Sequence, residues 1–481
     1  MGEPRLIEIS PVTRVEGHGK VTIHLDAQNR VEEARLHIVE FRGFERFIRG
    51  RLLWEVPVIV QRLCGICPVS HHLAAAKAMD VICGVDVLPP TAEKMRRLMH
   101  YGQVMQSHVL HFFHLAAPDL LFGFGAPAEQ RNIFEVIRQN PELGRRAIAM
   151  RKFGQDVIEA TAGKKIHGTG AIPGGINRNL PIATRDAFLG QIDDMLVWAQ
   201  EALALARGYT QDHADLVGGF AAFPSNHMSL VRPGDGALEL YDGQFRAIDS
   251  AGATIFDGLE CRRYHEVLVE DVRSWSYMKF PFIRALGPEA GWYRVGPLAR
   301  MNTASHIDTP LANAAHRDLR AHTGGAPNNT ALANHWARMI EVVHCLEKVR
   351  ELLHDPDLQG TDLVAKGERR EEGIGVIEAP RGNLIHHYRV DEHDQVTYCN
   401  LIVSTTHNNE GMNRAVKDVA THYLSGQERI TEGMLNHIEV AIRAYDPCLS
   451  CATHALGQMP LQVELFDTAG HLVDSRRRSG A

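Results

Sequence analysis

The sequence predicts an α+β protein that is mostly helical, with small antiparallel sheets at its edges. Several long stretches consist of strong helix-forming residues, whereas alternating apolar residues are concentrated near residues 20–40 and 374–406. Hydrophobic residues make up 44% of the 481 residues and charged residues 23%, which fits a folded protein with a large core. No repeats or linker-like stretches interrupt the chain, so we expect one compact unit.

Both alternating regions are expected to form antiparallel strands. Near the N-terminus, apolar alternation over 20–26 and 34–40 flanks a polar turn at Gln28 and Asn29, which indicates a hairpin. The later region contains three such runs, and Arg381-Gly382 marks the turn between the first two.

The helical stretches are long and have clear boundaries. Residues 70–80 are strong helix formers, and Pro89-Pro90 marks a break before a long helix that Thr91 could cap and that ends near Pro118. Further helices are expected over 143–162, 183–208 and 328–355. The glycine-rich segment between them, 164–180, follows no strand and lacks a GxxxxGK pattern, so it does not predict nucleotide binding.

Charge and hydropathy exclude several classes of partner. The 58 acidic and 51 basic residues are spread without blocks and leave a net charge of −7, which favours neither nucleic acid nor a membrane surface. The N-terminal residues lack the pattern of an export signal, and no segment offers the roughly 18 uncharged apolar residues of a membrane helix. We therefore expect a cytoplasmic protein.

Four of the eight cysteines form two Cys-x-x-Cys pairs, Cys64/Cys67 and Cys448/Cys451. Cysteines at this spacing on a tight turn can direct both sulfurs to one metal, and four thiolates can complete a coordination sphere. A structural zinc site usually has its pairs roughly 15–20 residues apart, and a thioredoxin-like pair follows a βαβ pattern; neither holds here. Spacing alone leaves one shared metal site and two unrelated pairs equally open.

The remaining cysteines stand alone in the sequence. They are most simply buried small apolar residues, and they form no second cluster able to hold an iron–sulfur centre: Cys83, Cys261, Cys345 and Cys399.

The residues around the cysteine pairs resemble the large, catalytic subunit of nickel–iron hydrogenases. Arg-x-Cys-Gly-x-Cys-x-x-x-His at 62–71 and Asp-Pro-Cys-x-x-Cys-x-x-His at 446–454 are similar to the two signature motifs of that family. Further family motifs occur in the same order along the chain: Thr-Arg-Val-Glu-Gly-His at 13–18, Arg-Gly-Phe-Glu at 42–45, His167 with Pro-Gly-Gly at 173–175, Glu-Ala-Pro-Arg-Gly at 378–382 and Val-Ser-Thr-Thr at 403–406. The resemblance covers residues 10–454 and implies the family fold, with a central bundle of long helices.

By this resemblance, Cys64 and Cys448 are terminal nickel ligands, and Cys67 and Cys451 bridge nickel to iron. The iron carries carbon monoxide and two cyanides. Soft thiolates stabilise several nickel oxidation states, and cleavage of dihydrogen into a proton and a hydride needs a Lewis-acidic metal beside a base.

The proton-accepting groups also follow from the resemblance. Cys448 is expected to accept the first proton, with the guanidinium region of Arg381 as the competing assignment. Glu16 then passes protons onward, and burial beside thiolates would raise the pKa of its carboxyl.

Residues around the metal centre are implied as well. Arg381 and Ser404 resemble the donors to the cyanides, and Asp446 is expected to orient Arg381. The chain departs from some relatives at Ser107, which replaces an aspartate that helps to hold this arginine.

A second, hard-cation site is implied by the same resemblance. Glu45, His454 and the backbone carbonyl near Asn400 resemble a site that usually holds magnesium.

The resemblance divides the chain into a catalytic domain over residues 1–454 and a C-terminal extension over residues 455–481. In most family precursors a dedicated maturation endopeptidase removes such a tail after the final motif histidine, here His454. Retaining the tail would keep the segment with Cys448 and Cys451 open until nickel enters.

The electrons released from hydrogen must leave through a partner protein, because no cysteines remain for an iron–sulfur cluster and the chain shows no dinucleotide or flavin motif of its own. The resemblance is strongest to the cytoplasmic, bidirectional, NAD-reducing subfamily, and it implies an iron–sulfur small subunit with diaphorase subunits that carry FMN and iron–sulfur clusters. The alternatives are NADP- or deazaflavin-coupled hydrogenases and a hydrogen-sensing regulatory subunit, although sensors typically lack a cleavable tail. The related quinone-site subunit of respiratory complex I lacks the four cysteines.

Overall fold

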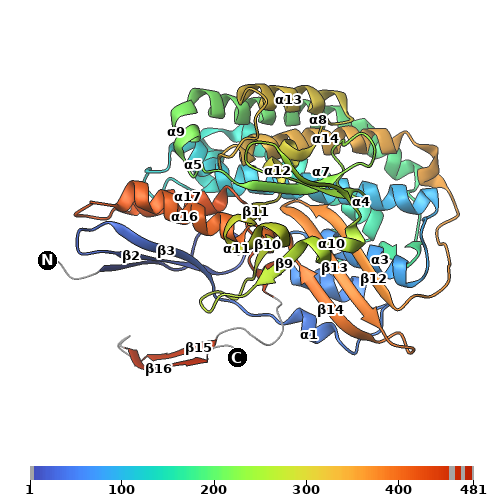
Figure 1. The fold of residues 1–481 in the computed structure, drawn as a ribbon. Coiled ribbons are helices and arrows are strands. Elements are labelled where there is room, and N and C mark those ends of the chain that lie inside the picture. Colours follow the sequence, from blue (N-terminus) through green and yellow to red (C-terminus); the bar gives the residue numbers. More distant parts are fainter. Residues whose placement is uncertain (1–4, 454–460, 467–471, 479–481) are drawn as a thin grey trace.

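The computed structural model describes residues 5–453, 461–466 and 472–478. Its centre is a bundle of long helices, drawn in the upper part of Figure 1. The bundle consists of α4 (Pro90–Leu110), α7 (Pro141–Ala162), α8 (Ile182–Asp212), α13 (Pro310–His322) and α14 (Asn334–Leu353). α14 packs against α4, α8 and α13 and is buried on nearly every side, as expected of a central helix.

The predicted long helices are confirmed, with differences at their ends. α14 begins at Asn334, not at residue 328. α4 begins at Pro90, whose fixed φ suits the first helical position, and the Thr91 hydroxyl donates to the carbonyl of Asp357. The predicted Thr91 cap is therefore wrong. The helical path also continues through Pro118, because a π-helical turn (His111–Ala116) joins α4 to α5 (Ala117–Phe122).

The predicted N-terminal hairpin is present within a three-stranded antiparallel sheet. Its strands are β1 (Arg5–Ile9), β2 (Gly19–Leu25) and β3 (Val31–Ile38), with Val21 opposite Leu36. One face packs against α16 (Asn409–Leu424), which in turn packs against α17 (Glu432–Arg443), as the left of Figure 1 shows. This layer brings the N-terminal motif close to the segment that follows α17, where Glu16 forms a β-bridge with Cys448.

The second predicted sheet places Arg381 beside the first cysteine pair. β12 (Glu372–Ala379), β13 (Gly382–Val390) and β14 (Val396–Ile402) pair in sequence order and pack on α3 (Pro68–Ile82). The contact is close: a Cβ on Gly375 would lie 2.0 Å from the Ala74 carbonyl oxygen, so β12 needs a glycine here. Because β12 and α3 run in opposite directions, the turn at Arg381 lies at the start of α3, next to Cys67.

Most of the remaining described strands were not predicted, because they are short and lack long alternation. β6 (Asn226–Val231), β7 (Gln244–Ile248), β8 (Thr254–Leu259) and β11 (Tyr293–Arg294) form a sheet in the order β11-β6-β7-β8. The two-stranded pairs are β4 (Ala171–Ile172) with β5 (Gly175–Ile176), β9 (Leu268–Asp271) with β10 (Phe280–Ile283), and β15 (Leu461–Phe466) with β16 (Leu472–Arg478). The shorter helices are α1 (Phe44–Ile48), α2 (Val56–Ile59), α6 (Ile133–Gln139), α9 (Ala214–Gly219), α10 (Tyr264–Val267), α11 (Gly287–Ala290), α12 (Pro297–Thr303) and α15 (Ser404–His407).

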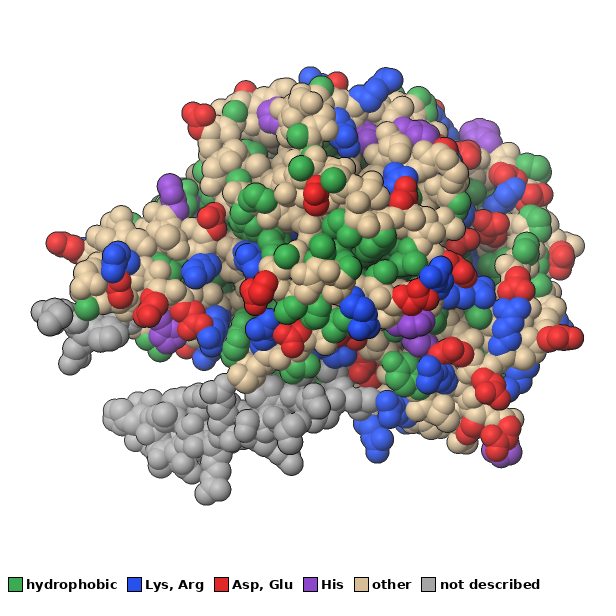
Figure 2. Space-filling model, in the orientation of Figure 1, with side chains coloured by type: hydrophobic (Ala, Val, Ile, Leu, Met, Phe, Trp, Pro, Cys, Tyr) green, Lys and Arg blue, Asp and Glu red, His purple; other side chains and the backbone are tan. Residues whose placement is uncertain are grey.

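The surface agrees with the mixed charge of the sequence. Figure 2 shows acidic and basic side chains interspersed over the visible face, with no large patch of one sign. Among the helices that the structure describes, none has both the length and the apolar character needed to cross a membrane.

Candidate metal centre

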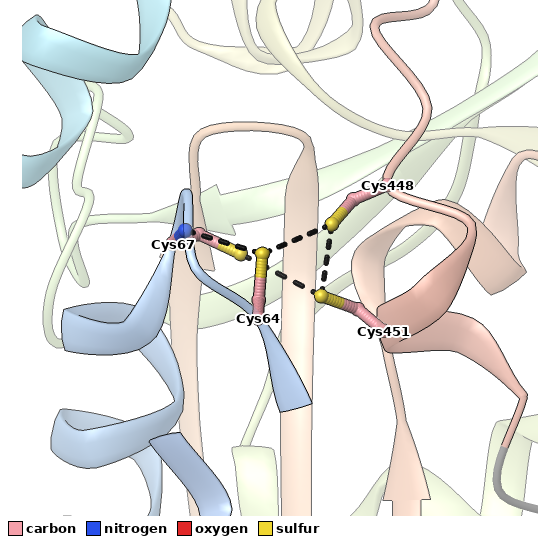
Figure 3. Close-up of side chains that lie close together, drawn as sticks. All are labelled: Cys64, Cys67, Cys448 and Cys451. Atoms are coloured by element: carbon pink, nitrogen blue, oxygen red, sulfur yellow. Dashed lines mark hydrogen bonds between the residues drawn. The ribbon is translucent and has the colours of Figure 1, made fainter. Parts of the chain in front are cut away.

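The two cysteine pairs form one site. Cys64 and Cys67 lie just before α3, and Cys448 and Cys451 follow α17, yet all four sulfurs lie within 4.8 Å of one another (Figure 3). The Sγ–Sγ distances are 3.3 Å for Cys64–Cys448, 3.8 Å for Cys67–Cys451 and 2.8 Å for Cys448–Cys451. Among the described residues this is the one cluster of histidine, cysteine and acidic side chains able to hold a metal ion. Two unrelated pairs, the alternative that spacing left open, are thereby excluded.

Local structure explains how each pair is presented. Pro68 occupies the first position of α3, so the chain turns sharply at Cys67 before the helix starts. The second pair is held by the backbone: Cys448 N donates to Thr405 Oγ1 at 2.9 Å, and Leu449 N donates to the Glu16 carbonyl at 2.9 Å. The second pair is therefore fixed from outside its own turn.

The donor set fits a soft transition metal. All four thiols are buried, and each sulfur lies near another sulfur. Hydrogen bonds from the neighbouring cysteines hold the pKa of Cys64 well below its usual value, whereas burial raises the pKa values of Cys448 and Cys451 well above theirs. Only a bound cation would compensate four thiolates at such distances, so metal entry and thiol deprotonation should be coupled.

Glu16 lies against the second pair. Its Oε2 is 3.0 Å from Cys448 Sγ and accepts the backbone N–H of Ser450 at 3.1 Å. Burial, and next the negative charge of the Cys64 thiolate, raise the pKa of this carboxyl above its usual value. The geometry suits a group that exchanges protons with Cys448.

Arg381 is anchored by the residues that the sequence singled out. Its Nε donates to the Asp446 carbonyl at 2.5 Å, its Nη2 to Asp446 Oδ1 at 3.0 Å and its Nη1 to Ser107 Oγ at 3.3 Å. Ser107 thus contacts the arginine directly. A small cavity beside the sulfurs is lined by Arg381 and Ser404 among others, although the Ser404 hydroxyl donates to the Gly382 carbonyl at 2.8 Å.

Thr405 is a site residue that sequence reasoning did not assign. It lines the same cavity and accepts the Cys448 backbone N–H. Its position inside the Val-Ser-Thr-Thr motif was the available signal.

Two of the three residues expected at the hard-cation site lie among the residues that the structure describes. Glu45 and Asn400 line one cavity of about 480 Å³, and His454 lies outside the described residues. Burial raises the pKa of Glu45 to about 7, and its Oε1 accepts the Leu401 backbone N–H at 3.0 Å. Thr453, the last residue described before the extension, accepts the Arg42 backbone N–H at 3.1 Å and so ends next to α1.

The side chain of Asn400 is engaged within that cavity. Its Nδ2 donates to Glu270 Oε2 and to the Tyr264 hydroxyl, each at 3.2 Å. Glu270 also pairs with Lys279 at 3.1 Å. Sequence reasoning missed Glu270 and Lys279, because neither belongs to a motif.

Comparison with known proteins identifies the family. The model described as "Nickel-dependent hydrogenase" matches residues 42–122 and 241–454, and one described as "HoxL-like" matches residues 6–41. The chain is 51% identical to the NAD-reducing hydrogenase HoxS subunit beta of Cupriavidus necator over 98% of this chain and 100% of that protein. It is 41% identical to a component of the F420-non-reducing hydrogenase of Methanothermobacter thermautotrophicus, over 97% of this chain and 99% of that protein.

Solved structures agree with these relatives. An NAD+-reducing [NiFe]-hydrogenase in the H2-reduced state superposes with a TM-score of 0.92 at 57% identity, covering 94% of this chain and 99% of that one. The NiFeSe hydrogenase of Desulfovibrio vulgaris Hildenborough superposes with a TM-score of 0.76 at 22% identity, covering 94% of this chain and 100% of that one, and this likeness shows the fold alone. The predicted fold and family are both confirmed. With its buried four-cysteine site, this chain belongs to the nickel-dependent hydrogenase family of oxidoreductases.

Proposed function

We propose that this chain is the catalytic subunit of an NAD-reducing hydrogenase, which cleaves dihydrogen reversibly into protons and electrons. The observation that carries the proposal is the convergence of four buried cysteine sulfurs from opposite ends of the chain. When bound, a nickel–iron centre with carbon monoxide and two cyanides on the iron would supply the Lewis acid that polarises dihydrogen and takes up its electrons. Cys64, Cys67, Cys448 and Cys451 would together hold this centre.

The chain's own side chains would then manage the proton. Cys448 is the first acceptor, and Glu16, 3.0 Å away, takes the proton from its sulfur. The competing acceptor, Arg381, is less suitable. Although burial lowers its pKa, the Asp446 carboxylate and the cysteine thiolates more than offset this effect, so the guanidinium stays protonated.

Arg381 instead has a positioning role in this proposal. Its contacts with Asp446 and Ser107 orient the guanidinium at the edge of the small cavity beside the sulfurs. There its guanidinium would donate to the cyanides of the iron, in a pocket from which bulk water is excluded, and Ser404 would do so once its hydroxyl turned away from the Gly382 carbonyl.

Two further parts of the proposal concern the end of the catalytic domain. Glu45, the backbone at Asn400 and His454 would hold magnesium, and a maturation endopeptidase would remove residues 455–481. The nickel-dependent hydrogenase match ends at residue 454, which supports this boundary. The intact mass of the active protein should correspond to a C-terminus at His454; an active protein that retains residues 455–481 would exclude processing.

Electrons would leave through an iron–sulfur small subunit to a diaphorase that carries FMN and iron–sulfur clusters and reduces NAD+. The 51% identity to a subunit of an NAD-reducing hydrogenase supports this partner set, and NAD+ as the acceptor fits the expected cytoplasmic location. The relatives named F420-non-reducing hydrogenase, at 41% identity, leave another electron acceptor as the second candidate.

The test is hydrogen-dependent reduction of NAD+, NADP+ and a deazaflavin by the complex purified with its natural partners. The proposal predicts reduction of NAD+ that is abolished by Cys448→Ser but retained by the matched variant Cys83→Ser, since Cys83 lies outside the site. Reduction of another acceptor alone would correct the partner set. Equal activity of Cys448→Ser and the unmodified enzyme would exclude the proposed centre.

A further inference from the structure

A row of polar side chains connects the metal centre with the protein surface. Glu16 Oε2 lies 3.0 Å from Cys448 Sγ and accepts the backbone N–H of Ser450 at 3.1 Å, which brings the Ser450 side chain next to the carboxylate. The Ser450 hydroxyl lies 3.4 Å from Glu40 Oε2. The other oxygen of Glu40 pairs with Nδ1 of His18, whose side chain is 66% exposed.

The fold brings these residues together through one glycine. Gly17 has φ +84°, and a Cβ at this position would lie 2.6 Å from Ser450 N and 2.9 Å from Ser450 Oγ. The loop can therefore close directly on Ser450, with Glu16 and His18 on either side of the glycine. Glu40 follows β3 and lies near His18 because the β2–β3 register pairs Gly19 with Ile38.

We propose that Ser450, Glu40 and His18 conduct protons between Glu16 and solvent. This inference rests on the proposed function, because it needs a proton released at Cys448. Each link joins a group that can donate to a group that can accept, and a serine hydroxyl does both at once. The chain of contacts is continuous from a buried sulfur to an exposed imidazole.

The steps balance in protons: Glu16 ends as a carboxylate, and rotation of the Ser450 hydroxyl and proton exchange of the His18 ring with water restore the relay before the next transfer. Protonated Glu16 gives its proton to Ser450 Oγ while the original hydroxyl proton of Ser450 passes to Glu40. Glu40 then gives a proton to Nδ1 of His18, and the imidazole releases one from Nε2 to water. No electron moves, and the reverse sequence delivers protons for hydrogen formation. Because the Glu40 side chain is itself 31% exposed, His18 speeds the final step without being required for it.

The test uses Ser450→Ala and Glu40→Gln in the complete enzyme complex. Glu32→Gln is the matched control, since it removes the same charge from an exposed position of β3. Two rates are compared: exchange of gaseous D2 with solvent protons, and para–ortho conversion of H2. The first requires protons to reach solvent, whereas the second requires only cleavage and recombination at the metal centre.

Both relay variants should lose about 100-fold or more in solvent exchange, the lower end of what a positioned proton-transfer group contributes. Para–ortho conversion, nickel content and the infrared bands of the centre should stay unchanged. His18→Ala should show a smaller loss that added imidazole restores.

Three outcomes would overturn parts of this scheme and can be told apart. Solvent exchange in Ser450→Ala and Glu40→Gln equal to that of Glu32→Gln would exclude the relay. A parallel fall of both rates would make these residues supports of Cys448, not conductors of protons. If the unmodified complex showed no para–ortho conversion, the proposed function itself would fail.

Discussion

Replacing Arg300 by methionine should destabilise the protein strongly, although Arg300 contacts none of the cysteines. The side chain is completely buried and donates to both oxygens of Glu341 at 2.6 Å and to Glu378 Oε2 at 2.7 Å. It also donates to the carbonyls of Ala379 and Pro380 at 3.0 and 3.1 Å. Arg300 therefore holds the backbone immediately before Arg381.

The expected magnitude follows from these contacts. Removing one partner of a buried ion pair costs about 3–5 kcal/mol, because the other charge stays buried without compensation. The control is Arg207→Met: Arg207 pairs with Asp318 at 2.8 Å on the surface, where an ion pair contributes about 1 kcal/mol or less. In Arg300→Met, a second change, Glu378→Gln, should recover part of the loss by removing one uncompensated charge.

The assay is urea unfolding of the complex, with infrared spectra of the folded variants. Arg300→Met should unfold at clearly lower urea than Arg207→Met, and its cyanide bands should shift because Arg381 is displaced. If both variants unfolded at the same urea concentration, the buried network would not contribute as the contacts imply.

Three further predictions concern separate features of the structure. Arg381→Lys cannot reproduce the forked contact with Asp446 and should lower hydrogen oxidation by about 100-fold at unchanged nickel content; a rate within twofold of the unmodified enzyme would contradict this. Gly17→Ala would place a Cβ 2.6 Å from Ser450 N and should reduce nickel incorporation, measured per chain, whereas full incorporation would show that the loop adapts. Burial lowers the pKa of His227 to about 3. Between about pH 6.5 and pH 3 the imidazole therefore binds a proton in the unfolded chain but stays neutral in the folded protein, which favours unfolding. The contribution of His227 to the free energy of unfolding should be fully present above pH 6.5 and decrease toward pH 4. His227→Asn should therefore make the urea midpoint less dependent on pH between pH 7 and 5. Identical pH profiles of the variant and the unmodified protein would refute this prediction.

The parts that sequence reasoning predicted are those encoded by short patterns. The three-residue spacing of Cys64 and Cys67 restricts both sulfurs to one side of a turn, and family motifs linked this pair to the distant one. Long helices such as α7 and α8 were predicted because helix formers persist over many turns. Such signals do not depend on knowing the rest of the fold.

The parts that were missed depend on contacts between distant segments. Arg300 and Glu341 stand alone in the sequence, and only the packing of α12 against α14 joins them. The Thr91 hydroxyl was assigned to a helix cap, but the carbonyl of Asp357 lies within its reach. A role for Glu40 and His18 could not be predicted from the sequence, because it depends on the loop at Gly17, which brings Ser450 between Glu16 and Glu40.

The central claim is that the four cysteines hold a nickel–iron centre. Its most direct test is the quantity of nickel, iron and zinc per chain in the purified complex, with an infrared spectrum of the same sample. We predict about one nickel per chain, iron in excess of nickel because the partner subunits carry iron–sulfur clusters, and absorption in the carbonyl and cyanide region. Zinc in place of nickel, without those bands, in a protein that ends at His454 would contradict the account and make the cysteines structural.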